Sequence, residues 1–319
     1  MLETLLIVLK YLTGLAIFLA IFGVATLYVF QSDLIYKPNI VFNSRTKLHL
    51  PSEKGLPNSE YVKIKTNDNV LIEGFLIKHE SDEKTKQSDT LLFFPPNSGN
   101  IGHKLPEAKS LFDKLGCNIF MLSYRGFGLS EGIPSEKGIR IDAECALSYL
   151  RSNPLTSNSR IIVYGFGFGG SVAIDLVSKY QNEFSGLILT NTSTSTADLI
   201  ASELPFTKPI GFIFSDTWDS VSRIKKIKSV PILFLCSEND DYVPTSQMKT
   251  LFDISSAYSE SDVGYKSFPG ATHTNITSLD DYYSAISDFW KLNFDTMPKY
   301  EPTYQFSTML PKQTTLYKK

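Results

Sequence analysis

IIVYGFGFGG, residues 161–170, is an apolar strand pattern that runs directly into closely spaced glycines. This is the setting of the motif G-x-S-x-G, in which a strand turns sharply into a helix and presents a serine nucleophile on the turn. Gly165 and Gly169 occupy the two positions that must be small for strand and helix to approach each other. The central position, where serine is expected, is Gly167. Because glycine adopts unusual backbone angles without steric cost, we predict that the turn is kept and the nucleophile is missing.

Short apolar runs alternate with helical stretches on both sides of this motif. The runs cover residues 91–94, 118–123, 160–164, 186–190, 231–236 and 265–268. Continuous apolar strands that alternate with helices indicate a parallel sheet buried on both faces. Two earlier runs, 61–65 and 70–78, are separated by Asn-Asp-Asn and predict a β-hairpin, and the polar stretch 80–89 predicts a loop. The sequence therefore predicts an α/β fold with a mostly parallel eight-stranded sheet and helices on both faces.

The N-terminus carries a separate apolar segment. Residues 11–30 contain no charged side chain, and this length is enough to cross the hydrocarbon core of a bilayer as a helix. A cleaved signal peptide is the alternative, but its apolar region is shorter and ends in small residues, whereas this segment ends in Leu27, Tyr28, Val29 and Phe30. We therefore predict a single-pass transmembrane anchor over residues 1–30, with the membrane as partner and location. An endomembrane and the plasma membrane are both compatible with it.

The rest of the chain divides by composition. Residues 31–58 are polar, contain proline and predict a linker, and residues 59–294 predict the α/β domain. Within that domain, residues 192–228 interrupt the strand and helix alternation and predict a cap insertion. Residues 295–319 predict a polar tail without fixed structure.

Composition excludes several classes of protein. The net charge of −2 leaves no basic excess for nucleic acid. The three cysteines lie far apart in apolar runs, so they predict buried small side chains, with neither a metal site nor a disulfide framework. Gly165, Gly167 and Gly170 fit the dinucleotide pattern G-x-G-x-x-G, but they follow the fifth strand, and the next strand is followed by Asn191 instead of an acidic residue. We therefore expect no dinucleotide binding at these glycines.

The remaining catalytic positions follow from chain order, which in folds with this turn is nucleophile, acid, histidine. Of the four histidines, only His273 follows a late strand, so we assign it the position of the general base. The loop after 231–236 supplies the acid. Asp240 is our choice, and Asp241, which better suits a helix N-cap, is the alternative.

An oxyanion hole needs two backbone N–H donors, one after the nucleophile and one from the loop after the third strand. Phe168 supplies the first, and Asn97 supplies the second because Pro95 and Pro96 have no N–H. Three serines are candidates for a surrogate nucleophile, and each lacks the strand–turn–helix setting. They are Ser98, Ser130, which lies in a second G-x-S-x-G match at residues 128–132, and Ser171.

These residues resemble the membrane-anchored α/β-hydrolases of the bud-emergence type, relatives of the serine aminopeptidase-like hydrolases. The resemblance runs from about residue 1 to 292 and includes the anchor, the elements NxGN (97–100) and SYRGFGLSEG (123–132), the glycine turn, Asp240 and His273. It implies the α/β-hydrolase fold and hydrolysis of acyl esters or thioesters, with an acyl-chain or acyl-protein ligand and no cofactor. Protein partners are not implied.

Two positions depart from the family pattern. The family turn reads Gly-x-Ser-Leu-Gly-Gly, whereas this chain has Gly167 and Phe168, and the usual His-Gly of the oxyanion loop is replaced by Pro95-Pro96. Loss of the serine favours a catalytically impaired pseudo-hydrolase, because glycine cannot act as a nucleophile. The alternative is an active esterase or thioesterase in which Asp240 and His273 activate water directly.

Overall fold

The computed structural model describes residues 1–295, so the predicted tail from residue 296 onward lies outside the described residues. Eight strands form one sheet in the order β1-β2-β4-β3-β5-β6-β7-β8. The strands are β1 (Ser59–Lys65), β2 (Leu71–Ile77), β3 (Thr90–Phe94), β4 (Asn118–Ser123), β5 (Ile161–Phe166), β6 (Gly186–Thr190), β7 (Ile232–Ser237) and β8 (Val263–Phe268). β1 and β2 form an antiparallel hairpin, β2 is antiparallel to β4, and the remaining pairs are parallel. The predicted mostly parallel eight-stranded sheet is therefore confirmed.

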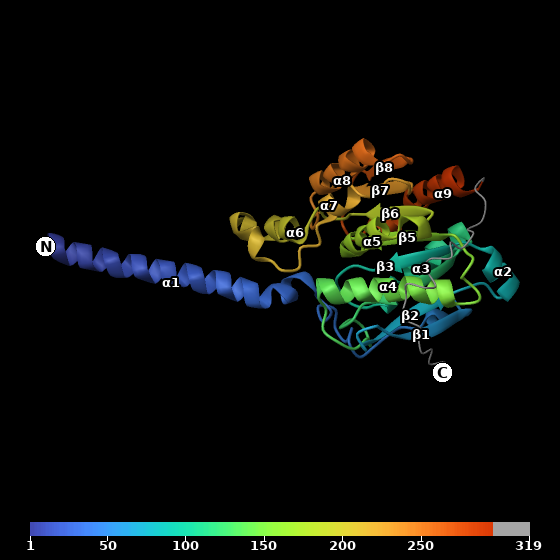
Figure 1. The fold of residues 1–319 in the computed structure, drawn as a ribbon, viewed down its shortest axis with the longest axis horizontal. Helices are drawn as coiled ribbons and strands as arrows, with labels where there is room; N and C mark the ends of the chain where they lie inside the picture. Colours follow the sequence, from blue (N-terminus) through green and yellow to red (C-terminus); the bar gives the residue numbers. More distant parts are fainter. Residues whose placement is uncertain (296–319) are drawn as a thin grey trace.

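Helices cover both faces of the sheet (Figure 1). One hydrophobic core lies between the sheet and the pair α3 (Leu105–Leu115) and α9 (Asp280–Phe294). A second core lies on the opposite face, beneath α4 (Glu136–Ser152), α5 (Phe168–Lys179) and α8 (Thr245–Tyr258). The central strands β3, β4, β5 and β6 are buried along their whole length, as expected for a sheet covered on both sides.

The stretch 80–89, predicted as a loop, contains the short helix α2 (Asp82–Gln87), so that prediction is wrong. The Ser81 side chain accepts a hydrogen bond from the Lys84 backbone and caps the helix. Lys78 also forms an ion pair with Asp82 in the first turn. A highly charged run therefore still forms a helix when its first residue is a good cap and its members are good helix formers.

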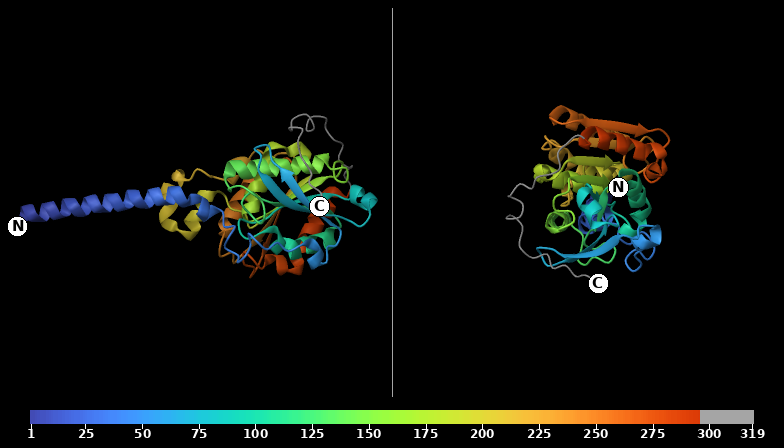
Figure 2. Two further views of the ribbon diagram at one scale, coloured as in Figure 1. Left: turned by 90° about the horizontal axis from the view of Figure 1, so that it is seen from below. Right: turned by 90° about the vertical axis from the view of Figure 1, so that its right-hand side faces the viewer.

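Helix α1 (Leu2–Ile35) projects away from the domain (Figures 1 and 2). Among the described residues it is the one helix long and apolar enough to cross a membrane, and its apolar window is fully exposed. Only Gln31 and Ile35 in its last turns are buried.

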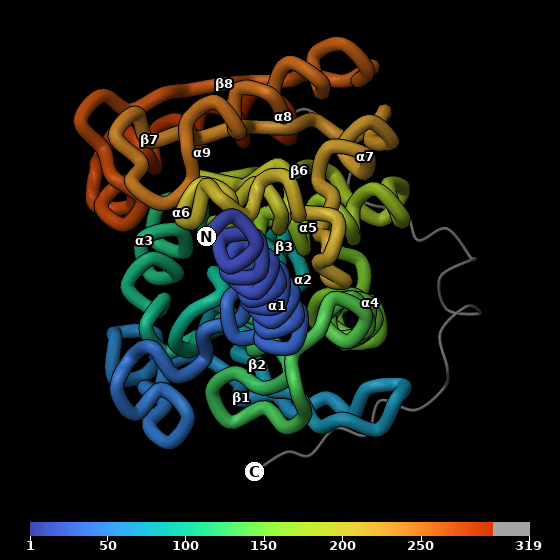
Figure 3. The backbone as a smooth tube through the Cα atoms, turned by 90° about the vertical axis from the view of Figure 1, so that its left-hand side faces the viewer, coloured from blue at the N-terminus to red at the C-terminus, as the bar shows by residue number. Residues whose placement is uncertain are grey.

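The residues after α1, predicted as a linker, lie against the domain. Tyr36, Ser44 and Leu56 are buried, and the segment includes the 3-10 helix η1 (Pro51–Lys54). The predicted cap region, 192–228, forms α6 (Thr196–Glu203), the 3-10 helix η4 (Pro205–Ile213) and α7 (Ser220–Ile224). Viewed along α1, α6 lies beside the helix (Figure 3).

Candidate active site

The turn between β5 and α5 has the geometry expected of a nucleophile elbow. Gly167 has φ 55° and ψ −120°, a conformation that L side chains rarely adopt, and its N–H donates to the Thr190 carbonyl at 2.8 Å. A Cβ atom on Gly169 would lie 2.0 Å from the Phe94 carbonyl oxygen, and one on Gly165 would lie 2.5 Å from the Gly169 carbonyl oxygen. These two glycines are therefore required by the close approach of strand and helix, and they hold the turn without a serine.

Asp240 and His273 form a hydrogen-bonded pair at the ends of neighbouring strands. His273 Nδ1 lies 2.8 Å from Asp240 Oδ2, and the Asp240 side chain is 2% exposed. The other carboxylate oxygen accepts from the backbone N–H groups of Tyr242 and Val243 at 2.8 and 2.7 Å, which fixes its orientation. Asp241, the alternative acid, is exposed. The structure thus brings Asp240 to the histidine and leaves Asp241 in solvent.

His273 faces the position of the missing side chain. An ideal Cβ atom on Gly167 would lie 3.3 Å from His273 Nε2 and 3.6 Å from Cε1. The imidazole ring packs against Phe166 and Tyr242, with ring centroids 5.4 and 5.2 Å away. A serine at residue 167 would therefore place its hydroxyl within reach of Nε2. All three predicted positions converge, with one of them lacking a functional group.

The segments that carry the two predicted oxyanion donors, Phe168 and Asn97, meet at Gly167. α5 begins at Phe168, and the first N–H groups of a helix have no intrahelical acceptor. On the other side, Pro96 lies 3.9 Å from the position of a Gly167 Cβ. Asn97 uses its carbonyl to accept from the Lys37 N–H and its amide to donate to the Ile35 carbonyl. These bonds hold the loop after β3 against the end of α1.

Sequence comparisons identify the family to which the chain belongs. The model of the dienelactone hydrolase family matches residues 130–300. The protein bem46 of Schizosaccharomyces pombe is 38% identical over 283 residues, which cover 88% of this chain and 93% of bem46. The chain is an α/β-hydrolase of the bud-emergence type. The α/β-hydrolase domain-containing protein WAV2 of Arabidopsis thaliana is 34% identical over 88% of this chain and 91% of its own length.

Two further comparisons concern a relative described as a membrane protein and a solved structure of similar fold. A protein of Saccharomyces cerevisiae described as the uncharacterized membrane protein YNL320W is 32% identical and covers 88% of this α/β-hydrolase and 95% of its own chain. The esterase Pf2001 of Pyrococcus furiosus superposes with a TM-score of 0.66 at 20% identity, over 81% of this chain and 97% of the esterase. The latter likeness concerns the fold alone.

The alternative serines of this α/β-hydrolase have other partners. Ser130 is buried, donates to the Ser123 carbonyl and accepts from the Glu73 N–H. Ser171 is buried and shares a hydrogen bond with Ser220 at 3.1 Å. Ser98 forms an isolated β-bridge with Lys37. These contacts place Ser130 and Ser171 in hydrogen-bond networks that do not include His273.

The sequence did not reveal that the end of α1 belongs to the site region. The Tyr36 hydroxyl donates to Asp216 at 2.7 Å and accepts from Trp218 Nε1 at 2.9 Å. Burial and, after it, the Asp216 carboxylate raise the pKa of the Tyr36 hydroxyl far above its usual range, so it remains a donor. The rings of Tyr36 and Trp218 both pack edge-on against Phe168, at 5.6 and 5.1 Å. The residue that ends α1 therefore contacts the residue that follows the elbow.

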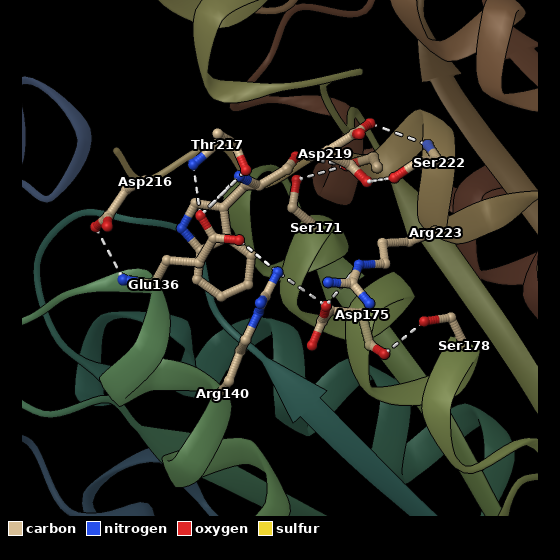
Figure 4. Close-up of polar contacts among 12 residues, drawn as sticks. Glu136, Arg140, Ser171, Asp175, Ser178, Asp216, Thr217, Asp219, Ser222 and Arg223 are labelled. Atoms are coloured by element: carbon tan, nitrogen blue, oxygen red, sulfur yellow. Dashed lines mark hydrogen bonds and ion pairs between the residues drawn. The ribbon is translucent and has the colours of Figure 1, made fainter. Parts of the chain in front are cut away.

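A polar cluster joins the predicted cap region to α4 (Figure 4). The Glu136 carboxylate accepts from the backbone N–H groups of Thr217 and Trp218, and the Glu136 N–H donates to Asp216 at 2.8 Å. Arg140 pairs with the same carboxylate. The N-terminus of α4 is thereby joined to the cap segment that covers Phe168.

Lys37 connects three parts of the site region. Its ammonium donates to the Tyr242 hydroxyl at 2.8 Å and pairs with Glu203 at 3.4 Å. Burial alone would lower the pKa of Lys37, but the hydrogen bond to Tyr242 and the attraction of Glu203 outweigh it and raise the pKa. The charged side chain therefore links the end of α1 to the cap and to the loop that carries Asp240. No local sequence pattern marks Tyr36 or Lys37, because the groups to which their side chains donate hydrogen bonds lie more than 160 residues away.

Proposed function

We propose that this protein is a membrane-anchored pseudo-hydrolase that binds an acyl-chain or acyl-protein ligand and lacks serine-based hydrolysis. One observation carries the proposal: a complete elbow and a paired histidine surround a position that has no side chain, Gly167. Removing the nucleophile of a catalytic triad lowers turnover by a factor on the order of 10⁶. The acyl ligand is supported by the match to the dienelactone hydrolase family, whose name describes hydrolysis of a lactone, which is a cyclic ester.

Membrane attachment through α1 is part of the same proposal. The helix is exposed over its apolar window, and a relative of similar length is described as a membrane protein. A cleaved signal sequence is excluded if the N-terminal residues remain in the mature chain. Mass spectrometry of the protein extracted from membranes tests this directly.

A second candidate function is hydrolysis by activated water, and one observation favours it. His273 Nε2 faces the space that a Gly167 side chain would fill, and the Asp240 pair that orients the ring is intact. A general base in that position can deprotonate a water molecule held there. Oxyanion stabilisation and binding without a nucleophile typically leave a rate about 10³–10⁴ above the uncatalysed reaction.

The test is hydrolysis of short and long acyl p-nitrophenyl esters and acyl thioesters by the full chain in detergent micelles. Wild type, Gly167→Ser, His273→Ala and the double variant are compared. The proposal predicts an inert wild type and a Gly167→Ser variant whose activity requires His273. Turnover by the wild type that His273→Ala abolishes would instead support the water mechanism.

A further inference from the structure

Exposed apolar side chains gather on two segments outside α1. On η4, Phe206 and Phe212 are 66% and 85% exposed, and on the loop after α1, Ile40 and Phe42 are 68% and 88% exposed. Large apolar side chains scattered singly over a surface need no explanation, but contiguous ones mark an interaction surface. We therefore expect these two segments to contact another apolar surface.

Both segments lie at the end of the domain from which α1 leaves. The N–H of Ser215, two residues after η4, donates to the Gln31 side chain in the last turns of α1 at 2.7 Å. The Ser44 carbonyl, two residues after Phe42, accepts from Asn100 on the loop that follows β3. The views agree that α6 and the chain after it lie beside the C-terminal turns of α1 (Figures 1 and 3).

The length of α1 sets the level of the bilayer surface. The uncharged stretch 11–30 rises about 1.5 Å per residue, or about 30 Å in total, which matches the hydrocarbon thickness. The hydrocarbon boundary then falls close to Phe30. Ser215 is hydrogen-bonded to Gln31, the residue after Phe30. Since η4 ends two residues before Ser215, η4 lies at the level of this boundary.

The charges of both segments suit the same environment. η4 reads PFTKPIGFI, and its single charged residue, Lys208, is exposed. The loop over residues 38–47 contains Arg45 and Lys47 and no acidic residue. Exposed aromatic and aliphatic side chains accompanied by basic ones are typical of segments that lie in the membrane interface, where the lysine stem extends toward the headgroups.

We infer that η4 and residues 40–42 are embedded in the leaflet at which α1 ends, so that helix and cap form one membrane-seated face. The inference rests on the proposed anchoring by α1 and deepens the proposed function. Lys37, only seven residues beyond Phe30, donates to Tyr242, whose ring packs against His273. The candidate site therefore lies next to the bilayer surface, and its ligand is an acyl chain already resident in that leaflet.

The experiment places an environment-sensitive fluorophore on single introduced cysteines of the full chain. The native Cys117, Cys145 and Cys236 are buried, so the label reacts at the introduced position. Phe212→Cys and Phe42→Cys report on the proposed face. Leu292→Cys, 71% exposed near the end of α9, is the matched control, and Ile17→Cys reports on α1 itself. Each protein is reconstituted in phosphatidylcholine vesicles with nitroxide-labelled lipid near the headgroup or near the chain end.

We expect headgroup-proximal nitroxide to quench the labels at residues 212 and 42 at least about twofold more than the label at 292, because interfacial segments lie about 5–10 Å deep. Quenching equal to that at 292 overturns the inference. If the labels at residues 212 and 42 are protected from aqueous iodide but are not quenched by nitroxide lipid, the inference is also overturned, because protein and not lipid would then cover these two segments. The label at residue 17 distinguishes failure of this inference from failure of the proposed anchoring. If nitroxide near the chain end quenches it, α1 spans the bilayer whatever the labels at residues 212 and 42 show. If it is not quenched, the proposed anchoring itself is wrong.

Discussion

The loops after β7 and β8 carry a paired carboxylate and imidazole, whereas the turn after β5 carries only backbone. The first region depends on side chains, since the 2.8 Å bond between Asp240 and His273 orients the base. The second depends on the absence of side chains, since Gly165 and Gly169 allow strand and helix to meet. An elbow is therefore maintained by packing and does not need the nucleophile that it presents in active relatives of the fold.

The largest expected effect concerns the loops after β7 and β8, which carry Asp240 and His273. In a Gly167→Ser background, Asp240→Asn should reduce acyl ester turnover by about 10³–10⁴, because the carboxylate that fixes the imidazole tautomer is lost. The exposed neighbour Asp241→Asn is the matched control and should leave turnover within about twofold, since surface substitutions have small effects. Steady-state kinetics on both variants measures this. An equal loss in the two would show that Asp240 has no special role.

The next largest effect is expected for substitutions in the turn between β5 and α5. Gly169→Ala should lower the free energy of unfolding by about 3 kcal/mol or more, because the new Cβ would lie 2.0 Å from the Phe94 carbonyl oxygen. Gly167→Ala should cost about 1–3 kcal/mol, mainly from its φ of 55°. Thermal unfolding of the full chain in detergent micelles gives the two values. A Gly167→Ala variant less stable than Gly169→Ala would contradict the proposed packing role of Gly169.

The smallest effect concerns the contact between α1 and the cap. Tyr36→Phe removes one hydrogen bond to Asp216 and one from Trp218, so the free energy of unfolding should fall by about 1–3 kcal/mol. Tyr28→Phe, on an exposed turn of the same helix, is the control and should change stability by less than about 0.5 kcal/mol. The same unfolding measurement applies. Equal free energies of unfolding for the two variants would mean that the buried Tyr36 hydroxyl does not stabilise the fold.

Much of this molecule is readable from local sequence. Continuous apolar runs predicted the buried strands, because a strand covered on both faces carries mostly apolar side chains. The glycine spacing predicted the elbow, because the packing requirement is local to Gly165–Gly169. Chain order led to Asp240 and His273, which the structure brings within hydrogen-bonding distance.

What the sequence did not predict depends on distant partners. Tyr36 and Asp216 are 180 residues apart, and nothing in either segment signals that they meet. The segment after α1 looks like a linker by composition, yet its apolar side chains Tyr36 and Leu56 are buried against the domain. Helix α2 was missed for a different reason: its stability depends on a capping serine and charge pairs, which hydrophobic periodicity does not detect.

The central claim is that an assembled site lacks only its nucleophile. Intact-mass analysis after exposure of the full chain to an alkyl fluorophosphonate tests it most directly, because this reagent phosphonylates a serine activated by a general base. The account predicts no adduct on the wild type, one adduct on Gly167→Ser, and loss of that adduct when His273→Ala is added. An adduct on the wild type, or a folded Gly167→Ser variant that remains unmodified, would contradict it.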